Sequence, residues 1–242
     1  MIVSGGAVAE ACEQLAERVL RIGAKLLQAK REDVRLENGE VVGPSGRIGV
    51  SEVARVWYRR PQDLPPDVDA SGLEVTAGYK AKRDTGTFSY AAHAAVVAVD
   101  PETGELEILD YVVVEDGGTL VNPLIVDGQI LGGTAQGIGT ALYEEMRYDA
   151  QGQPLGSTLS DYLLPGAAEM PEVRIVHMAT PSPYTRFGQK GLGEGGAIAP
   201  PAAITNAVND ALKGLGVELL VSPITPRRIA DAVESARGKA PA

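Results

Sequence analysis

The chain has 242 residues, and 32 aspartate and glutamate residues against 22 lysine and arginine residues give it a formal net charge of −10. This balance argues against nucleic-acid binding, because contacts to phosphates depend on clustered lysine and arginine. No apolar run approaches the roughly 20 residues of a membrane span, and acidic residues interrupt any N-terminal signal-peptide pattern. One cysteine, Cys12, and two histidines offer no disulfide and no convincing zinc or iron–sulfur site, and they predict a cytoplasmic protein.

The N-terminal third predicts a helix, a hairpin and two further elements. Apolar residues recur at three- and four-residue steps over residues 7–28, as in an amphipathic helix. Asn38-Gly39 predicts the type I′ turn of a hairpin over residues 33–42. Ser51 is expected to cap a short helix that reaches Tyr58, and residues 73–79 are expected to form a strand.

Two alternating segments, residues 88–100 and 105–115, predict a long hairpin joined by the turn at Asp100–Gly104. One apolar face of this hairpin is expected to pack on helices. Its members are Val96, Val97, Val99, Leu106, Ile108, Val112 and Val114.

Three helices are expected in the second half. Asp127 is predicted to cap a helix that runs to Met146. An internal glycine costs a helix about 1 kcal/mol relative to alanine, so four of them indicate that a backbone or a ligand presses on this helix: Gly132, Gly133, Gly137 and Gly139. A further helix is expected over residues 199–212, and Thr225-Pro226 predicts the start of the last one.

These elements predict an α+β fold with mixed sheets and packed helices. We expect one domain over residues 1–237, in which a helical and hairpin lead-in (1–70) precedes the part that carries the candidate site (71–237). The tail, residues 238–242, is expected to be disordered.

The most informative segment is Gly188–Gly196, where a single acidic residue, Glu194, stands among five glycines and just before a helix start. Glycine lets a backbone approach a ligand closely. An isolated carboxylate in such a loop can act as a general base. It can equally be a solvated loop carboxylate.

Three loops are expected to converge, namely residues 115–123, 127–129 and 190–194. Each lies at a strand end or a helix start, where free N–H groups receive polar ligands. Gln129 is either an ordinary side chain at a helix start or a donor to an oxo or phosphate-type oxygen. Lys190 can pair with an anionic cofactor, lie on the surface or form an internal ion pair.

Three other polar residues are expected to have structural roles. Asp116 is predicted to orient Gly117-Gly118 through an Asx-type turn. His93 and His177 lie in strand-like or apolar surroundings and are expected in the core or at an interface.

Eight motifs occur in order along the second half: Asp116-Gly-Gly, Asn122-Pro123, Gly128-Gln129, Gly132–Gly139, Glu144-Glu145, Asp161–Pro165, Thr180–Pro183 and Lys190–Gly196. Their order and spacing resemble the C-terminal part of the molybdenum-binding subunit of the xanthine dehydrogenase/aldehyde oxidase family. The bacterial branch that includes the aerobic carbon monoxide dehydrogenase large chain is most similar. The resemblance covers essentially the whole chain and is strongest over residues 86–213.

The resemblance implies a cofactor and a set of residue roles. Family members hydroxylate a carbon with oxygen from water, and their molybdenum is held by a pyranopterin, with no permanent protein ligand in most members. No metal-ligating residue is therefore expected here. Glu194 matches the glutamate that takes the proton of the attacking hydroxyl, Gln129 with Gly128 matches the cofactor-contacting glutamine, and Gly193 and Lys190 lie in a cofactor-contacting loop. The cytosine dinucleotide form of the cofactor is expected.

The resemblance also implies a hetero-oligomer. A 2Fe–2S subunit and an FAD subunit would carry electrons away. The family's molybdenum subunit is much longer, and the N-terminal half of the metal site lies outside this sequence. Either a split gene supplies that half as a separate chain, which we favour because the sequence begins with Met1 before a predicted helix, or the sequence is a fragment that does not hold the cofactor alone.

We therefore expect a subunit of a molybdenum hydroxylase that acts on a small aldehyde, purine or N-heterocycle, with Glu194 as general base. The alternative is a non-catalytic remnant or structural subunit that stabilises a partner molybdenum subunit, although Glu194 and Gln129 are both intact. An unrelated glycine-loop nucleotide-binding protein is disfavoured, because no glycine-rich segment ends in the Gly-Lys-Ser/Thr of a P-loop.

Overall fold

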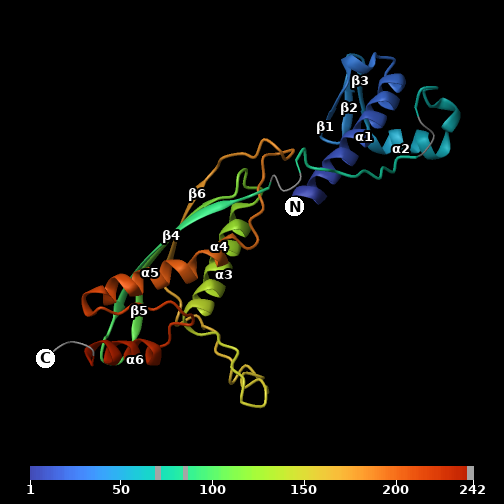
Figure 1. Cartoon of the computed structure of the whole chain (residues 1–242). Coiled ribbons are helices and arrows are strands. Elements are labelled where there is room, and N and C mark those ends of the chain that lie inside the picture. The colour runs from blue at the N-terminus through green and yellow to red at the C-terminus, as the bar shows by residue number, and fades with distance from the viewer. Residues whose placement is uncertain (69–71, 84–86, 239–242) are drawn as a thin grey trace. The chain divides into compact units, whose positions relative to one another are not determined.

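The computed structural model describes residues 1–68, 72–83 and 87–238 (Figure 1). The chain divides by its contacts into two compact units, Met1–Lys82 (unit 1) and Arg83–Ala242 (unit 2). The expectation of a single domain over residues 1–237 stays a prediction. Except for Gly238, the tail that is expected to be disordered lies outside the described residues.

Unit 1 packs two helices with a three-stranded antiparallel sheet in the order β1-β2-β3. Its elements are α1 (Ile2–Leu26), a 3-10 helix (Arg31–Asp33), β1 (Arg35–Glu37), β2 (Glu40–Gly43), β3 (Gly46–Gly49), α2 (Val50–Arg59) and a second 3-10 helix (Pro61–Asp63). Ile22 of α1, Val41 of β2 and Val53 of α2 are fully buried in one core. Gly23 is required at this contact, because a Cβ there would stand 2.7 Å from the Val41 methyl groups.

Two of the predictions for unit 1 are confirmed and two are wrong. The expected N-terminal helix forms as α1, and the hairpin turn has positive φ at both Asn38 and Gly39, as a type I′ turn requires. Ser51 does not cap α2, since the helix has already begun at Val50 and Gly49 is the capping residue. Residues 73–79 form no strand, because no neighbouring strand pairs with them. The Arg18 guanidinium instead bonds the carbonyls of Gly72 and Glu74.

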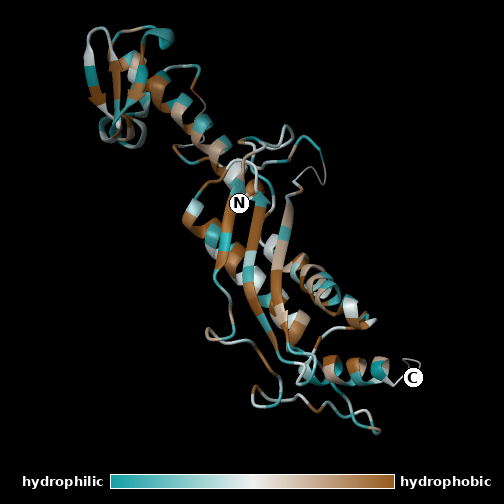
Figure 2. Ribbon diagram, turned by 90° about the vertical axis from the view of Figure 1, so that its left-hand side faces the viewer, coloured by the Kyte–Doolittle hydropathy of each residue, from teal (hydrophilic) through white to brown (hydrophobic). Residues whose placement is uncertain are grey.

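Unit 2 places three helices on a mixed sheet in the order β4-β5-β6. Its elements are β4 (Tyr90–Val99), β5 (Leu106–Asp116), α3 (Pro123–Leu142), β6 (Val173–Met178), α4 (Gly195–Ile198), α5 (Pro200–Leu212), a 3-10 helix (Lys213–Leu215) and α6 (Pro226–Arg237). β4 and β5 form the predicted hairpin, and hydrophobic residues predominate along the strands (Figure 2). β6, which the sequence analysis did not predict, pairs parallel to β5. A parallel pair needs a long crossover, which α3 and the segment after it provide.

The core of unit 2 lies between one face of this sheet and α3, α5 and α6. A β-bulge changes which residues of β5 face it. Val96 pairs with Asp110 and Val97 with Ile108, so Leu109 is an extra residue in β5. Beyond it the alternation reverses, and Tyr111 and Val113 are buried in place of the predicted Val112 and Val114. The prediction is also wrong for Val96, which lies 55% exposed on the other face.

The predicted cap of α3 is also wrong. The Asn122 side chain accepts a hydrogen bond from the Ile125 N–H, and Pro123 is the first helical residue. Proline suits that position because the first helical N–H has no partner within the helix. The helix therefore starts before Asp127, which lies inside it, and ends at Leu142. The last helix begins as predicted, with the Thr225 hydroxyl accepting from the Arg228 N–H.

Two of the α3 glycines allow another backbone to approach, as the sequence predicted. A Cβ on Gly133 would stand 3.0 Å from the Ala197 nitrogen and from the Gly196 Cα. A Cβ on Gly137 would stand 2.6 Å from the Pro200 ring. In contrast, a Cβ on Gly132 would meet nothing within 4 Å. Glycine thus brings α4, and the Glu194 loop that leads into it, directly onto α3.

Neighbouring Gly132 and Gly133 form a matched pair that tests this packing. We expect Gly132→Ala to raise the free energy of unfolding of the full chain by up to about 1 kcal/mol, through helix propensity alone. Gly133→Ala should lower it by about 1–3 kcal/mol, because its methyl group overpacks against α4 backbone. Urea denaturation measures both. Equal effects of the two substitutions would contradict the close α3–α4 contact.

Candidate functional site

The first and third predicted loops meet at the C-terminal end of β5. The Lys190 N–H donates to the Gly117 carbonyl at 2.9 Å, and the Thr119 N–H donates to the Gly188 carbonyl at 3.0 Å. A Cβ on Gly118, whose φ is +66°, would collide with the Gly188 carbonyl oxygen. Glycine at this position therefore lets the loop after β5 lie directly against the Glu194 loop.

Asp116 connects these loops through one fully buried carboxylate. Its Oδ1 accepts from the Gly118 N–H at 2.9 Å, which is the predicted Asx-type turn, and from the Thr180 N–H at 3.2 Å. It also accepts from the Lys190 ammonium at 3.0 Å. Lys190 further lies over the Tyr90 ring, 4.3 Å from its centroid. Of the three alternatives for the Lys190 side chain, the structure therefore has the internal ion pair.

The electrostatics of Asp116 favour its charged form. Burial on its own would raise the pKa of Asp116, but hydrogen bonds from Thr180, Gly118 and Lys190 outweigh burial and hold this pKa well below its usual range. Because the folded-state pKa is depressed, the stabilisation is present at neutral pH and is lost only as the pH falls through the acidic range.

The second loop meets the third at Gln129. The Gln129 Oε1 lies 3.9 Å from the position that a Cβ on Gly193 would occupy. Gln129, Gly128, Gly193 and Glu194 are all exposed. Glu194 precedes α4, its backbone carbonyl accepts from the Ala197 N–H, and its side chain does not cap the helix. The structure thus brings the Gln129 amide and the Glu194 loop to one accessible surface of unit 2.

Sequence reasoning missed Glu115, which lies below this surface. Its side chain is 1% exposed, and neither carboxylate oxygen has a hydrogen-bond partner among the described residues. Burial raises the pKa of Glu115 and the Asp116 charge raises it further, while the nearby Ser89 hydroxyl and the His177 ring lower it in part. An acidic residue next to Asp116 at the end of an apolar strand was the available signal, but the sequence analysis placed Glu115 only in the loop of residues 115–123.

The two histidines have structural partners. His93 is partly buried, and its Nδ1 lies 3.0 Å from the Tyr111 hydroxyl. His177 Nε2 lies 2.7 Å from Asp127 Oδ1 and links β6 to the start of α3. In the described ranges, no three His, Cys, Asp or Glu side chains are grouped so as to hold a metal ion. No helix in the described part of the chain is both long and apolar enough to cross a membrane.

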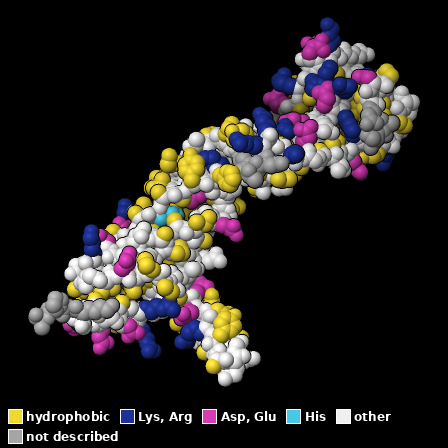
Figure 3. Space-filling view, in the orientation of Figure 1, with side chains coloured by type: hydrophobic (Ala, Val, Ile, Leu, Met, Phe, Trp, Pro, Cys, Tyr) yellow, Lys and Arg dark blue, Asp and Glu magenta, His cyan; other side chains and the backbone are white. Residues whose placement is uncertain are grey.

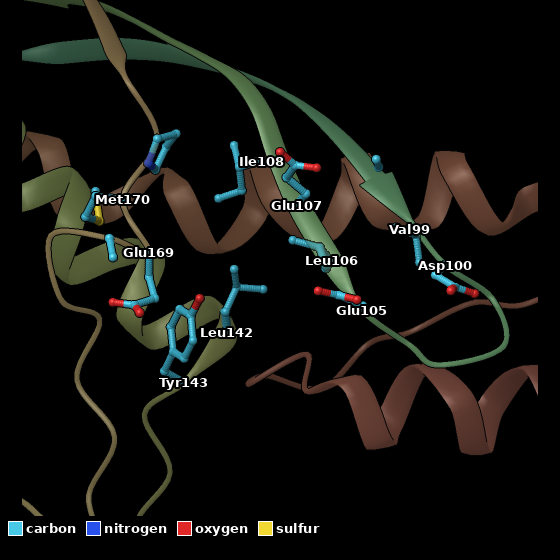
Figure 4. Close-up of a pocket in the computed structure, with 13 residues that line it drawn as sticks. Val99, Asp100, Glu105, Leu106, Glu107, Ile108, Leu142, Tyr143, Glu169 and Met170 are labelled. Atoms are coloured by element: carbon cyan, nitrogen blue, oxygen red, sulfur yellow. The ribbon is translucent and has the colours of Figure 1, made fainter.

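A cavity of about 780 Å³ lies away from these loops, at the hairpin end of β5 (Figure 4). It is lined by residues of the β4–β5 turn, the end of α3 and the segment before β6, and four of them are acidic: Asp100, Glu105, Glu107 and Glu169. None of the predicted site residues lines it.

Comparison with known proteins identifies the family. Residues 1–171 match the model of the molybdopterin cofactor-binding domain, which is more than half of the chain. The chain belongs to the molybdopterin cofactor-binding domain family. This match includes Gly128 and Gln129 and ends before the Glu194 loop.

Individual relatives extend the similarity over nearly the whole chain. The large subunit of nicotine 6-hydroxylase from Paenarthrobacter nicotinovorans is 37% identical over 236 residues, which are 96% of this chain and 29% of that protein. The carbon monoxide dehydrogenase large chain from Hydrogenophaga pseudoflava is 32% identical over 231 residues, 94% of this chain and 28% of that protein. The crystal structure of quinoline 2-oxidoreductase from Pseudomonas putida 86 has a TM-score of 0.80 and 40% identity, and covers 94% of this chain and 29% of its own.

The resemblance to the C-terminal part of the molybdenum-binding subunits is therefore confirmed, as is the α+β fold. The chain spans under a third of the length of these relatives. Its exposed residues fit a pterin-held metal. Glycines leave the backbone accessible at Gly128, Gly191 and Gly193, and the side chain of Gln129 is exposed beside them.

The buried ion pair provides a test of how the site is held. We expect Lys190→Met to lower the free energy of unfolding by about 3–5 kcal/mol at neutral pH, because it leaves the buried Asp116 charge uncompensated. The matched control is Arg174→Met, which breaks the exposed Arg174–Asp110 pair (2.6 Å) and should cost at most about 1 kcal/mol. Chemical denaturation measures both, and similar losses for the two variants would contradict the role given to Asp116.

Proposed function

We propose that this chain forms part of the cofactor site of a molybdenum hydroxylase, an oxidoreductase that hydroxylates a small organic substrate with oxygen from water. One observation carries the proposal. Three glycine-bearing loops meet around Glu194 in a chain of the molybdopterin cofactor-binding domain family. Glycine and an outward amide suit a large cofactor held by backbone contacts, and the isolated carboxylate suits a base.

In this proposal Glu194 is the general base and accepts the proton released as the new carbon–oxygen bond forms. The Gln129 amide and the backbones of Gly128 and Gly193 bind the cofactor, and Lys190 contributes by holding its loop through Asp116. The molybdenum–pyranopterin group, in the cytosine dinucleotide form, supplies the two-electron redox chemistry. The exposed position of Glu194 before α4 supports the role of base, because a proton taken up there can pass to solvent.

Partner chains are part of the proposal, because the carbon monoxide dehydrogenase relative is named as the large chain of its enzyme. The face of the sheet opposite the core supports an interface with a partner chain. It consists largely of small and apolar side chains, Ala92, Ala94, Val96, Val112, Val114 and Val176. Hydrophobic side chains are also visible over the surface of unit 2 in Figure 3. A 2Fe–2S subunit and an FAD subunit complete the proposed assembly.

We propose an N-heterocycle as the substrate, ahead of an aldehyde or a purine. Of the three relatives described above, the two with the higher sequence identity are named for nicotine and quinoline. Both compounds contain a nitrogen ring. A screen of N-heterocycles, aldehydes and purines with an artificial electron acceptor tests this choice. Turnover of aldehydes or purines alone would overturn it.

The alternative is a remnant that stabilises a partner subunit without taking part in catalysis. Elemental analysis of the chain purified from its natural source, with whatever co-purifies, separates the two. The proposal expects about one molybdenum per copy of the chain together with larger partner chains. Partner chains without molybdenum would favour the remnant.

The role of Glu194 has its own test. We expect Glu194→Gln to leave the molybdenum content of the purified complex unchanged and to lower turnover by about 10²- to 10⁴-fold, because the amide does not accept the proton. Metal analysis and steady-state kinetics on the same preparation measure both quantities. Near-normal turnover at full molybdenum content would refute the assignment of the base.

The role of Gln129 is tested by occupancy of the cofactor. We expect Gln129→Ala to weaken cofactor binding by about tenfold or more, since a hydrogen bond to a charged group contributes about 1.5–3 kcal/mol. Gln136→Ala is the control, because Gln136 is an exposed glutamine of the same helix. The molybdenum content of the two complexes after dialysis gives the result, and equal retention would contradict a contact from Gln129.

A further inference from the structure

Glu115 occupies an unusual position directly beneath the Glu194 loop. A Cβ on Gly195 would stand 2.5 Å from the Glu115 Oε1 and 3.2 Å from its Oε2. The carboxyl group therefore occupies the space that a side chain at residue 195 would take, one residue after the proposed base. Gly195 is the first residue of α4, and Glu194 is the capping residue just before it. The position of the Gly195 backbone therefore also sets the position of Glu194.

The basic groups near Glu115 are already bound to other carboxylates. The Lys190 ammonium of the Glu194 loop is bound to Asp116. His177, which pairs with Glu115 across β5 and β6, is bonded through its ring to Asp127. Asp116 adds a negative charge next to Glu115 on the same strand, and Glu194 adds another next to Gly195. An ionised carboxylate here would be buried beside like charges, which the Ser89 hydroxyl and the His177 ring offset only in part.

We propose that Glu115 is a positioning residue that supports the catalytic loop as a neutral carboxylic acid. In this form it fills the space below Gly195 and fixes the start of α4. When Glu115 loses its proton, the buried charge is unpaired, the packing below Gly195 is lost, and Glu194 is no longer held in place. The raised pKa of Glu115 agrees with this arrangement. The effect of Glu115 on catalysis rests on the proposed role of Glu194 as the base.

The pH profile of turnover separates positioning from simple packing. Glu115→Gln keeps the size of the side chain and removes its titration. In the assembled complex, wild-type turnover should fall by about tenfold per pH unit above the point where Glu115 ionises. Glu115→Gln should lack this decline while keeping wild-type activity at lower pH. Superimposable profiles for the two proteins would overturn the proposal.

A double-substitution cycle tests the contact itself. Gly195→Ala places a methyl group against the carboxyl group and should lower turnover by at least about tenfold with molybdenum content unchanged. Glu115→Ala in the same chain removes the collision and should restore most of the loss. Gly132→Ala, where the added methyl meets nothing within 4 Å, is the control. Strictly additive effects of the two substitutions would contradict the contact.

Thermal unfolding tests the neutral state without any activity. Because the folded-state pKa is raised from the ordinary 4.5, Glu115 destabilises the wild type increasingly as the pH rises above this value, until the folded-state pKa is passed. The Tm of Glu115→Gln relative to wild type should therefore increase with pH and then level off. A Tm difference that is constant with pH would overturn the proposal. This test needs no hydroxylase activity, so its outcome is separate from that of the proposed function.

Discussion

The arrangement of the site depends on one buried carboxylate, that of Asp116. It accepts hydrogen bonds from the loop after β5, from the segment after β6 and from the Lys190 ammonium of the Glu194 loop. A buried charge is tolerated only when it is paired and hydrogen-bonded, so the three segments must stay together for unit 2 to remain folded. The same constraint holds the Glu194 loop against the end of β5. Stability and the geometry of the proposed site are therefore coupled through a residue that need not touch any ligand.

Glycine provides the second constraint, because it sets how closely the backbones approach. Gly133 and Gly137 let α4 and the start of α5 pack on α3, and Gly118 lets the Gly188 carbonyl approach the loop after β5. Glycines in α3 lower the stability of the helix itself. Packing of another backbone into the space of the missing side chain offsets this cost. Gly195 follows the same rule, except that its neighbour is the Glu115 carboxyl group. The Glu194 loop, which is equally rich in glycine, likewise lies against neighbouring elements.

Sequence predicted the elements that depend on local chemistry. The Asn38-Gly39 turn, the Asp116 turn and the Thr225-Pro226 cap involve residues within three positions of one another, and all three are confirmed. Predictions that depended on distant contacts were less accurate. Alternation did not reveal the extra residue Leu109 in β5, so Val112 and Val114 were assigned to the wrong side of the sheet. β6 was not predicted because its pairing partner β5 is separated from it in sequence by α3 and a long loop. The strand predicted over residues 73–79 does not form because no other strand pairs with it.

The sheet of unit 2 has a consequence for how the chain behaves on its own. β4 is an edge strand of ten residues, and Val96 and its alanine neighbours leave one side of it without charged groups. Unpaired edge strands and uncovered apolar sheet faces promote strand addition between copies. These two features therefore favour self-association of the isolated chain over a dispersed monomer, and any chain that covers this sheet face would suppress it.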